Sequence, residues 1–301
     1  MDIEKLLANP RAIRAVTSLD ALEFEQLVFP FEKEWVKLQR RSLTQRGTER
    51  TRALGAGRKG RLESPRHKLL FILIYFKLYP LQEVMALLFG FNQSEANRWI
   101  HKLTPLLEKA LGRRLELPAR APADLARVLA ECPTLEFVLD GVERPVRRPK
   151  DNDRQKGHYS GKKKRHSVKN LVVTSQGKIK GLSRTVAGSL HDKKMADQTG
   201  WRWPQRSRLL QDTGFQGYAP SGVEVLMPKK KPKGRPLTKI WKQINRAISR
   251  LRVPVEHALA GVKRCHIVAD IYRNFKTGFE DAVMLIACGL HNFRASRRCA
   301  A

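Results

Sequence analysis

The feature that most constrains the fold of this chain is a change in the spacing of its apolar residues. Up to about residue 117 they recur at helical spacing, whereas from about residue 134 short apolar runs and turn residues follow one another as in strands. This sequence of patterns predicts an all-α domain followed by an α/β domain with a mixed sheet. We therefore expect a helical segment with a basic arm over residues 1–62, the arm itself over 43–61, a helical domain over 63–117, and the α/β domain over 126–301.

The first half of the 63–117 domain contains two predicted helices. Ser64 and Pro65 form a helix-start signal ahead of a stretch that is apolar nearly all round, as in a buried helix. In the next segment Pro80 suits the first turn of a helix, and Gly90 suits its C-terminal cap.

The third predicted helix, over residues 93–103, has one apolar face and one polar face that carries Asn97 and Arg98. Two helices, a short turn and a polar third helix have the order of a helix-turn-helix, whose last helix enters the DNA major groove. An ordinary three-helix bundle has the same pattern. Thr104 and Pro105 resemble an N-cap and first turn, so we expect a separate fourth helix to begin there.

The second half of the chain predicts a mixed sheet with helices. Gln176 and Gly177 join two of its strands as a hairpin. The predicted strands cover residues 134–146, 166–175, 178–188, 208–215 and 223–228. The predicted helices cover residues 193–203, 239–252 with an extension to about 265, and 280–296.

Charge restricts the partners. The chain has 59 Lys and Arg against 28 Asp and Glu, a formal net charge of +31, which attracts nucleic acid or an anionic membrane face. A solvated basic surface is the remaining interpretation. The longest apolar run, residues 69–76, is far shorter than the ~20 residues of a membrane-spanning helix, and the first residues lack the pattern of a secretory signal. We expect a cytoplasmic protein with no membrane partner.

Three acidic residues occupy positions suited to chemistry. Asp140 and Asp212 each end an apolar strand segment, where ligands gather in open α/β sheets, and Glu256 lies in a basic helical stretch. Three converging carboxylates repel one another unless divalent cations neutralise them, which is the arrangement of a two-metal phosphoryl-transfer site. A turn at Asp140 and a helix-face pair of Glu256 with Arg252 explain the same residues without chemistry.

Five short motifs follow one another in a specific order along the second half of the chain. They are Asp140-Gly141 with Arg144-Pro145, the run YSGKKKRH over 159–166, Gly188 with His191-Asp192, the run DTGFQG over 212–217, and Val255-Glu256-His257. In this order and combination the chain resembles the DDE transposases of bacterial insertion sequences, and more narrowly the DDE superfamily endonucleases with an N-terminal helix-turn-helix.

The resemblance implies a ribonuclease-H-like catalytic domain, with Asp140 on the first strand, Asp212 on the fourth and Glu256 on the helix after the fifth. It implies that these carboxylates hold two divalent cations, Mg²⁺ or Mn²⁺, for strand cleavage at transposon ends and strand transfer into target DNA. His191 and Asp192 would support this site, although a cap-and-turn pair before a helix explains them equally well.

The predicted acidic helix also resembles that of the family. Arg252, Glu256 and Lys263 have the family spacing Arg-x3-Glu-x6-Lys, whereas Ser249 stands at its tyrosine position. Pro254 predicts a kink or a helix start, which would place Glu256 in a first turn, where the helix dipole favours the ionised carboxylate.

Basic residues near these acids are candidates for DNA contacts. Residues 144–169 contain eleven Lys and Arg against two Asp, and residues 229–235 contain a further basic run. We expect base reading by Asn97 and Arg98. The expected phosphate contacts come from Lys162, Lys163, Lys164, Arg165, Arg252 and Lys263.

The resemblance implies that the partner is double-stranded DNA, both the transposon ends and the target. It also implies a homo-oligomer on DNA, located in the bacterial nucleoid. A catalytically inactive or domesticated DNA-binding protein derived from a transposase is the alternative. It needs the basic surface and the helix-turn-helix but no convergent carboxylates.

Overall fold

The structure is a computed structural model that describes residues 2–40, 61–232 and 234–298. It divides into two compact units, Met1–Leu117 with Arg264–Ile267, and Pro118–Lys263 with Val268–Ala301. Nearly all of the predicted basic arm, residues 43–61, lies outside the described residues. In the described parts of the chain, no helix has both the length and the apolar character to cross a membrane.

The first unit is helical, as predicted. Ser64 caps α4, because its Oγ accepts a hydrogen bond from the His67 backbone N–H at 3.1 Å, and Gly90 ends α5 with a φ of +70°. Pro80 lies two residues before α5 rather than in its first turn, so that detail of the prediction was wrong. The helices of this unit are α1 (Ile3–Leu7), α2 (Pro10–Thr17), α3 (Ala21–Gln39), α4 (Pro65–Leu78), α5 (Gln82–Phe89) and α6 (Gln93–Arg113).

Helix α6 is longer than predicted. It runs through Pro105 without a break, so the separate helix expected at Thr104 does not exist. A proline inside a helix removes one backbone hydrogen bond and costs about 3 kcal/mol. Burial of the apolar stripe on both sides of Pro105, including Ile100 and Leu107, offsets this cost.

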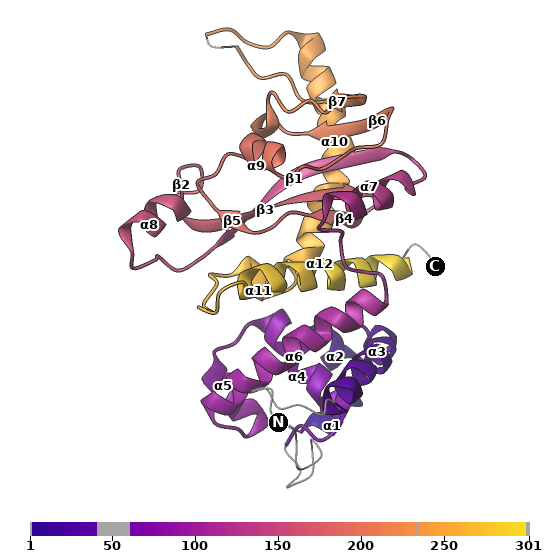
Figure 1. The fold of residues 1–301 in the computed structure, drawn as a ribbon, viewed down its shortest axis with the longest axis vertical. Coiled ribbons are helices and arrows are strands. Elements are labelled where there is room, and N and C mark those ends of the chain that lie inside the picture. The colour runs from indigo at the N-terminus through magenta and orange to yellow at the C-terminus, as the bar shows by residue number, and fades with distance from the viewer. Residues whose placement is uncertain (1, 41–60, 233, 299–301) are drawn as a thin grey trace. The chain divides into compact units, whose positions relative to one another are not determined.

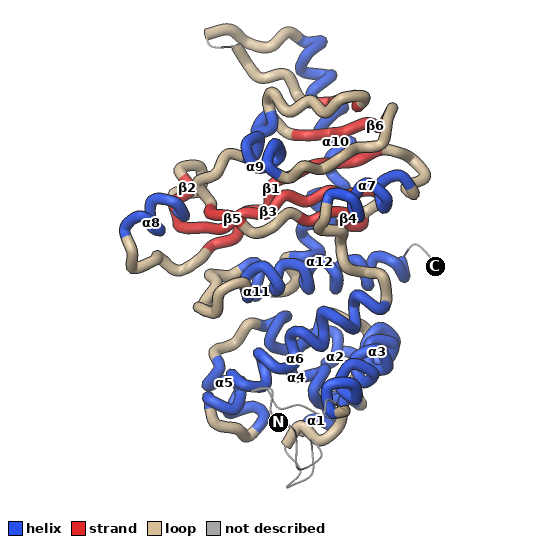
Figure 2. The backbone as a smooth tube through the Cα atoms, viewed as in Figure 1, coloured by secondary structure: helices blue, strands red, loops and turns tan. Residues whose placement is uncertain are grey.

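The second unit is built on a mixed sheet, which confirms the predicted fold class (Figures 1 and 2). Its order is β2-β3-β1-β6-β7, with β4 and β5 also paired to β3. Strand β1 is antiparallel to β3 and parallel to β6, and β6 is parallel to β7, an arrangement consistent with a ribonuclease-H-like fold. The strands are β1 (Glu136–Pro145), β2 (Tyr159–Ser160), β3 (Arg165–Ser175), β4 (Lys178–Leu182), β5 (Val186–Ala187), β6 (Ser207–Gln211) and β7 (Val223–Leu226).

Alternation along β1 separates two helical layers. Phe137 and Leu139 point into a buried cluster with side chains of α7 and α9, whereas Val138 lies on the α10 side. Asp140 shares the parity of Val138 and therefore faces α10. The remaining elements are α7 (Pro122–Ala130), α8 (Asn152–His158), α9 (Asp192–Gln198), the 3₁₀ turn η1 (Thr213–Phe215), α10 (Lys239–Val262), α11 (His266–Ala269) and α12 (Phe279–Arg298).

Two helical predictions need correction. Helix α9 begins at Asp192 and ends at Gln198, well before residue 203, and α7 and α8 were not predicted. Helix α10 passes through Pro254 unbroken, so Glu256 does not lie in a first turn and receives no N-terminal dipole. The apolar stripe of α10 extends to both sides of Pro254, and burial of Ile248, Val255 and Leu259 offsets the lost hydrogen bond.

Candidate active site at Asp140 and Asp212

The parallel pairing of β1 with β6 places two carboxylates side by side. In this register Leu139 lies opposite Gln211, so the next residues, Asp140 and Asp212, are neighbours. Asp140 is 19% exposed, and Asp212 is half-buried. The structure therefore brings together two of the three predicted carboxylates.

Both carboxylates are held by backbone N–H groups that follow them closely in sequence. The Gly141 N–H donates to Asp140 Oδ1 at 2.9 Å, and the Gly214 N–H donates to Asp212 Oδ1 at 2.8 Å. Burial raises the pKa of Asp140, and the negative charges of Asp212 and Asp192 raise it further, against Arg252 and the Gly141 N–H. A buried carboxylate with two negative charges nearby is well suited to binding a cation, because the cation would offset both effects.

Asp192 is the third acidic group in this neighbourhood. Its Oδ1 accepts a hydrogen bond from Lys169 Nζ at 3.3 Å, and Lys169 also donates to the Leu190 carbonyl at 3.1 Å. Asp192 approaches the two glycines closely, since a Cβ on Gly141 would lie 3.2 Å from its Oδ1 and a Cβ on Gly214 would lie 3.1 Å from its Oδ2. Small residues at both positions make room for this carboxylate.

His191, the other half of the predicted supporting pair, differs from Asp192 in its exposure and its contacts. It occupies the N-cap position of α9, makes no side-chain cap hydrogen bond and is exposed. The sequence pattern identified Asp192, but gave no indication that Lys169, 23 residues earlier, would orient it.

A cavity of about 700 Å³ opens beside these acids. It is polar, and basic side chains from three separate segments line it together with Asp192 and Asp212, whereas Asp140 is not part of its lining. Among its lining residues are Asp192, Asp212, His191, Lys162, Lys169 and Lys230. A cavity with this lining can accept a phosphate ester next to carboxylates.

Helix α10 contributes a cation to the site. Arg252 Nη2 lies 3.7 Å from Asp140 Oδ1, and both side chains are mostly buried. Glu256, one turn further along α10, is exposed, and so is Lys263 at the helix C-cap. Within the described ranges, no group of three or more His, Cys, Asp or Glu side chains is arranged to hold a metal ion.

The donor chemistry nevertheless fits hard divalent cations. Asp140, Asp212 and Asp192 offer only carboxylate oxygens, the ligands that Mg²⁺ and Mn²⁺ prefer, and their charges act on one another. Arg252 and Lys169 compensate part of this negative charge.

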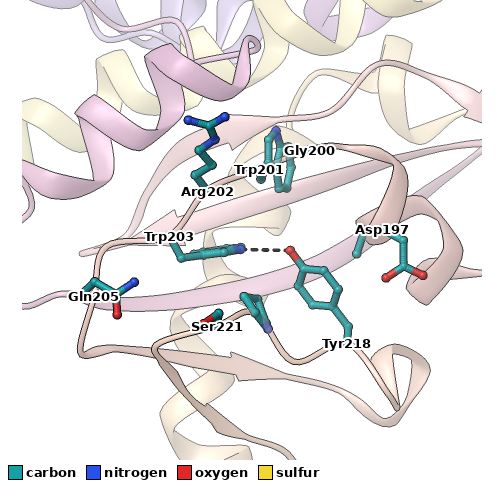
Figure 3. A pocket seen from close by; sticks show the side chains of 10 residues that line it. Asp197, Gly200, Trp201, Arg202, Trp203, Gln205, Tyr218 and Ser221 are labelled. Atoms are coloured by element: carbon teal, nitrogen blue, oxygen red, sulfur yellow. Dashed lines mark hydrogen bonds between the residues drawn. The ribbon is translucent and has the colours of Figure 1, made fainter.

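The turn that follows Asp212 is fixed from the far side of β6. Trp203 Nε1 donates to the Tyr218 hydroxyl at 3.0 Å (Figure 3). Gln211 Nε2 donates to the Tyr218 carbonyl at 2.9 Å. Tyr218 thus ties the residue before Asp212 to the end of its turn. These contacts border a second cavity of about 550 Å³, which lies away from the acids.

Comparison with known proteins agrees with this geometry. The family described as helix-turn-helix of DDE superfamily endonuclease matches residues 60–113, and the DDE superfamily endonuclease family matches residues 139–292. The chain belongs to the DDE superfamily endonucleases. It is 30% identical over 232 residues, 75% of this chain and 79% of the relative, to a probable transposase for insertion sequence element IS702 from Microchaete diplosiphon. No solved structure matches the chain significantly.

The predicted resemblance to insertion-sequence DDE transposases is therefore confirmed, and a DDE transposase is the function that this homology supports. The helix-turn-helix corresponds to α4, α5 and α6 of the first unit. On α6, Arg98 is exposed, whereas Asn97 is partly buried and its Nδ2 donates to Gln82 Oε1 of α5 at 3.1 Å. Only Arg98 of this predicted base-reading pair is fully presented to solvent.

The basic turn of this DDE endonuclease lies between β2 and β3. Lys162, Lys163 and Lys164 form the turn, Arg165 begins β3, and all four residues are exposed. Lys162 also lines the cavity beside Asp212. The turn therefore brings predicted phosphate contacts to the candidate site.

Proposed function

We propose that this DDE transposase binds transposon ends and catalyses divalent-metal-dependent strand cleavage and strand transfer at Asp140 and Asp212. The observation that carries the proposal is the adjacency of these two carboxylates where the parallel pairing of β1 with β6 stops; Asp212 also lines a cavity with basic walls. Strand ends of an open α/β sheet are where ligands bind, and paired carboxylates suit phosphoryl transfer.

Asp140, Asp212 and Glu256 would hold two divalent cations, Mg²⁺ or Mn²⁺. The chemistry that such cations would supply is activation of a water and stabilisation of the leaving 3′ oxygen. Asp192 is a positioning residue: held by Lys169, it packs against Gly141 and Gly214, the residues that follow Asp140 and Asp212 closely in sequence. Arg252 and Lys263 add positive charge from α10 for the DNA phosphates.

Two parts of the protein contact DNA in this proposal, the basic turn between β2 and β3 and helix α6. Lys162, Lys163, Lys164 and Arg165 contact phosphates next to the scissile bond, which positions the duplex without reading its sequence. Arg98, with Asn97 beside it, reads bases from α6, because a guanidinium suits guanine and an amide suits adenine. Replacing Arg98 by Ala lowers affinity for cognate ends more than for random DNA; an equal loss on both substrates contradicts base reading.

A homo-oligomer that pairs two ends in the nucleoid completes the proposal, and light scattering of the protein–DNA complex measures its stoichiometry. The alternative, an inactive DNA-binding derivative, needs no paired carboxylates. The side-by-side placement of Asp140 and Asp212 argues against it.

Nicking of DNA that carries the element ends, with Mg²⁺ or Mn²⁺, tests the catalytic assignment. Asp140→Asn, Asp212→Asn and Glu256→Gln should each lose at least ~100-fold in rate while keeping DNA affinity. Asp153→Asn, at a 92% exposed side chain on α8, is the matched control and should cut normally. Undiminished cutting by any of the first three removes that residue from the centre, and absence of cutting by the wild type supports the DNA-binding alternative.

A further inference from the structure

A second basic element lies outside the motifs that the proposed function uses. Between residues 227 and 255 there are ten Lys and Arg and no Asp or Glu. Ordinary solvated surfaces intersperse both signs, so a stretch of this length without one acid indicates a polyanionic partner. We call residues 227–232 and 234–250, from the loop after β7 and the first half of α10, the basic spur.

The spur is tied together internally. The Lys229 N–H donates to Asn245 Oδ1 at 2.8 Å, and Asn245 Nδ2 donates to the Lys229 carbonyl at 2.9 Å. Lys229 Nζ also lies 4.1 Å from the centre of the Trp241 ring, within cation–π range. These contacts fix Lys229, near the start of the loop, against α10.

The helical half of the spur presents its charge on one face. Lys239, Lys242, Arg246 and Arg250 follow at intervals of three, four and four residues, and all are exposed. They span about 16 Å along the axis, at 1.5 Å per residue. That length matches about five phosphate intervals along one strand of a duplex.

The apolar face of α10, opposite its basic face, shows that the first half of the helix projects from the unit. Ile248, Val255 and Leu259 of its apolar stripe are buried, whereas Ile240 and Ile244 at the start of the same stripe are exposed. In Figure 1 the start of α10 lies beyond β7, the last strand of the sheet. The first half of α10 therefore lies largely outside the packed core of the unit.

We infer that the basic spur binds the phosphate backbone of duplex DNA as it leaves the active site. Lys230, at the base of the spur, lines the same cavity as Asp212, so the track of positive charge begins at the candidate centre and continues along α10. This inference rests on the proposed function and assigns it a second DNA contact surface, separate from the helix-turn-helix.

An anionic membrane surface is the competing partner, because a basic helix with an exposed apolar stripe also suits lipid headgroups. DNA is favoured because the charge is shared between loop and helix and connects to the cavity of an endonuclease. The ammonium group of Lys229 also lies over the ring of Trp241. Trp241 is the aromatic side chain of the spur that would otherwise be available to anchor it in a membrane.

The test compares two full-length variants that each lose three exposed charges. Lys242→Gln/Arg246→Gln/Arg250→Gln alters the spur, and Arg127→Gln/Lys194→Gln/Arg202→Gln is the control at exposed sites elsewhere in the same unit. Affinity for a short random-sequence duplex is measured by fluorescence anisotropy across salt concentration. A third variant that exchanges Lys and Arg at the spur positions keeps the charge and should behave as the wild type.

Each phosphate contact contributes about 0.9 to the slope of log K against log salt, so loss of three should make the slope less negative by about 2.7. Between roughly 50 and 200 mM salt the wild type then loses about 40-fold more affinity than the spur variant. The control should retain the wild-type slope. Circular dichroism verifies that α10 is intact.

Three outcomes overturn the inference. The slope of the spur variant equals that of the wild type, or both triple variants lose the same slope, or the spur variant keeps its DNA slope but loses binding to vesicles of equal parts phosphatidylglycerol and phosphatidylcholine. The last result assigns the spur to a membrane. If the wild type itself does not bind duplex DNA, the proposed function fails, which is distinct from failure of the spur alone.

Discussion

Replacement of Gly214 by Ala perturbs the candidate centre without altering a charge. A Cβ at this position would lie 2.9 Å from Asp212 Oδ1 and 3.1 Å from Asp192 Oδ2, whereas ordinary contacts begin at 3.4 Å. The two carboxylates must therefore retreat by about 0.5 and 0.3 Å. Both groups that flank Gly214 are displaced from the positions that the fold gives them.

The size of the expected effect follows from that displacement. A misplacement of 1 Å costs about 100-fold in rate, so a shift of about half that distance should cost about 10-fold, or about 1.4 kcal/mol of transition-state stabilisation. Affinity for DNA should be unchanged, because the phosphate-binding side chains are not moved.

Single-turnover nicking of supercoiled plasmid, together with anisotropy for binding, measures both quantities. Gly157→Ala is the matched control: the nearest atom to its Cβ is Ala187 Cβ at 4.0 Å, an ordinary contact. Nicking by Gly214→Ala at the wild-type rate, with the control also normal, would refute the claim that the positions of Asp212 and Asp192 matter for cleavage.

Two further predictions concern ionisation. Burial raises the pKa of Asp140, so its ionisation costs more in the folded than in the unfolded chain. The free energy of unfolding of the wild type should therefore fall as pH rises through the folded pKa of Asp140. Asp140→Asn should have a higher Tm than the wild type at neutral pH, by about 2–4 °C for each kcal/mol of unfolding free energy regained. Because cleavage needs the ionised carboxylate, the wild-type cleavage rate should rise with pH across the same range. Burial opposes ionisation of Asp281 also, but hydrogen bonds from Arg120 and Thr185 more than compensate and lower its pKa. Asp281→Asn should lose ~2 kcal/mol of stability at neutral pH, and urea titrations should show this difference vanish as pH falls below about 4, through the depressed pKa; a difference that persists in acid contradicts the assignment.

Local signals in the sequence predicted part of the structure well. The alternation of side chains along β1 follows from the sequence, with Phe137 and Leu139 on one face and Asp140 on the other, because the period of a strand is fixed by its backbone. The hairpin at Gln176 and Gly177 is also present, and both residues have the positive φ that such a turn needs.

Prolines were the main source of error. Pro105 and Pro254 both lie inside continuous helices, α6 and α10, although local chemistry favours a break at each. Tertiary burial of the flanking apolar stripes decides the outcome, and the sequence pattern alone does not weigh that energy against the lost hydrogen bond.

The candidate site was predictable only where a local motif existed. Asp212 follows the last residue of β6, as predicted, whereas Asp140 lies in the middle of β1, so the prediction that Asp140 ends a strand was wrong. The adjacency of the two carboxylates follows because the parallel pairing of β1 with β6 stops just before them. Lys169 reaches Asp192 across 23 residues because β5, which shortly precedes Asp192, pairs with β3 at Lys169, and no local pattern contains that information. The proximity of Arg252 to Asp140 was not predicted either, because packing sets which face of α10 meets the sheet.

The most direct test of the central claim, that Asp140 and Asp212 form one catalytic centre, is a double-mutant cycle on metal-dependent nicking. Rates are measured for the wild type, Asp140→Asn, Asp212→Asn and the double variant at saturating DNA. Groups that act as a unit are strongly non-additive, so each single variant should lose nearly as much rate as the double variant. Losses that multiply in the double variant, or substantial cutting by either single variant, would contradict a shared centre.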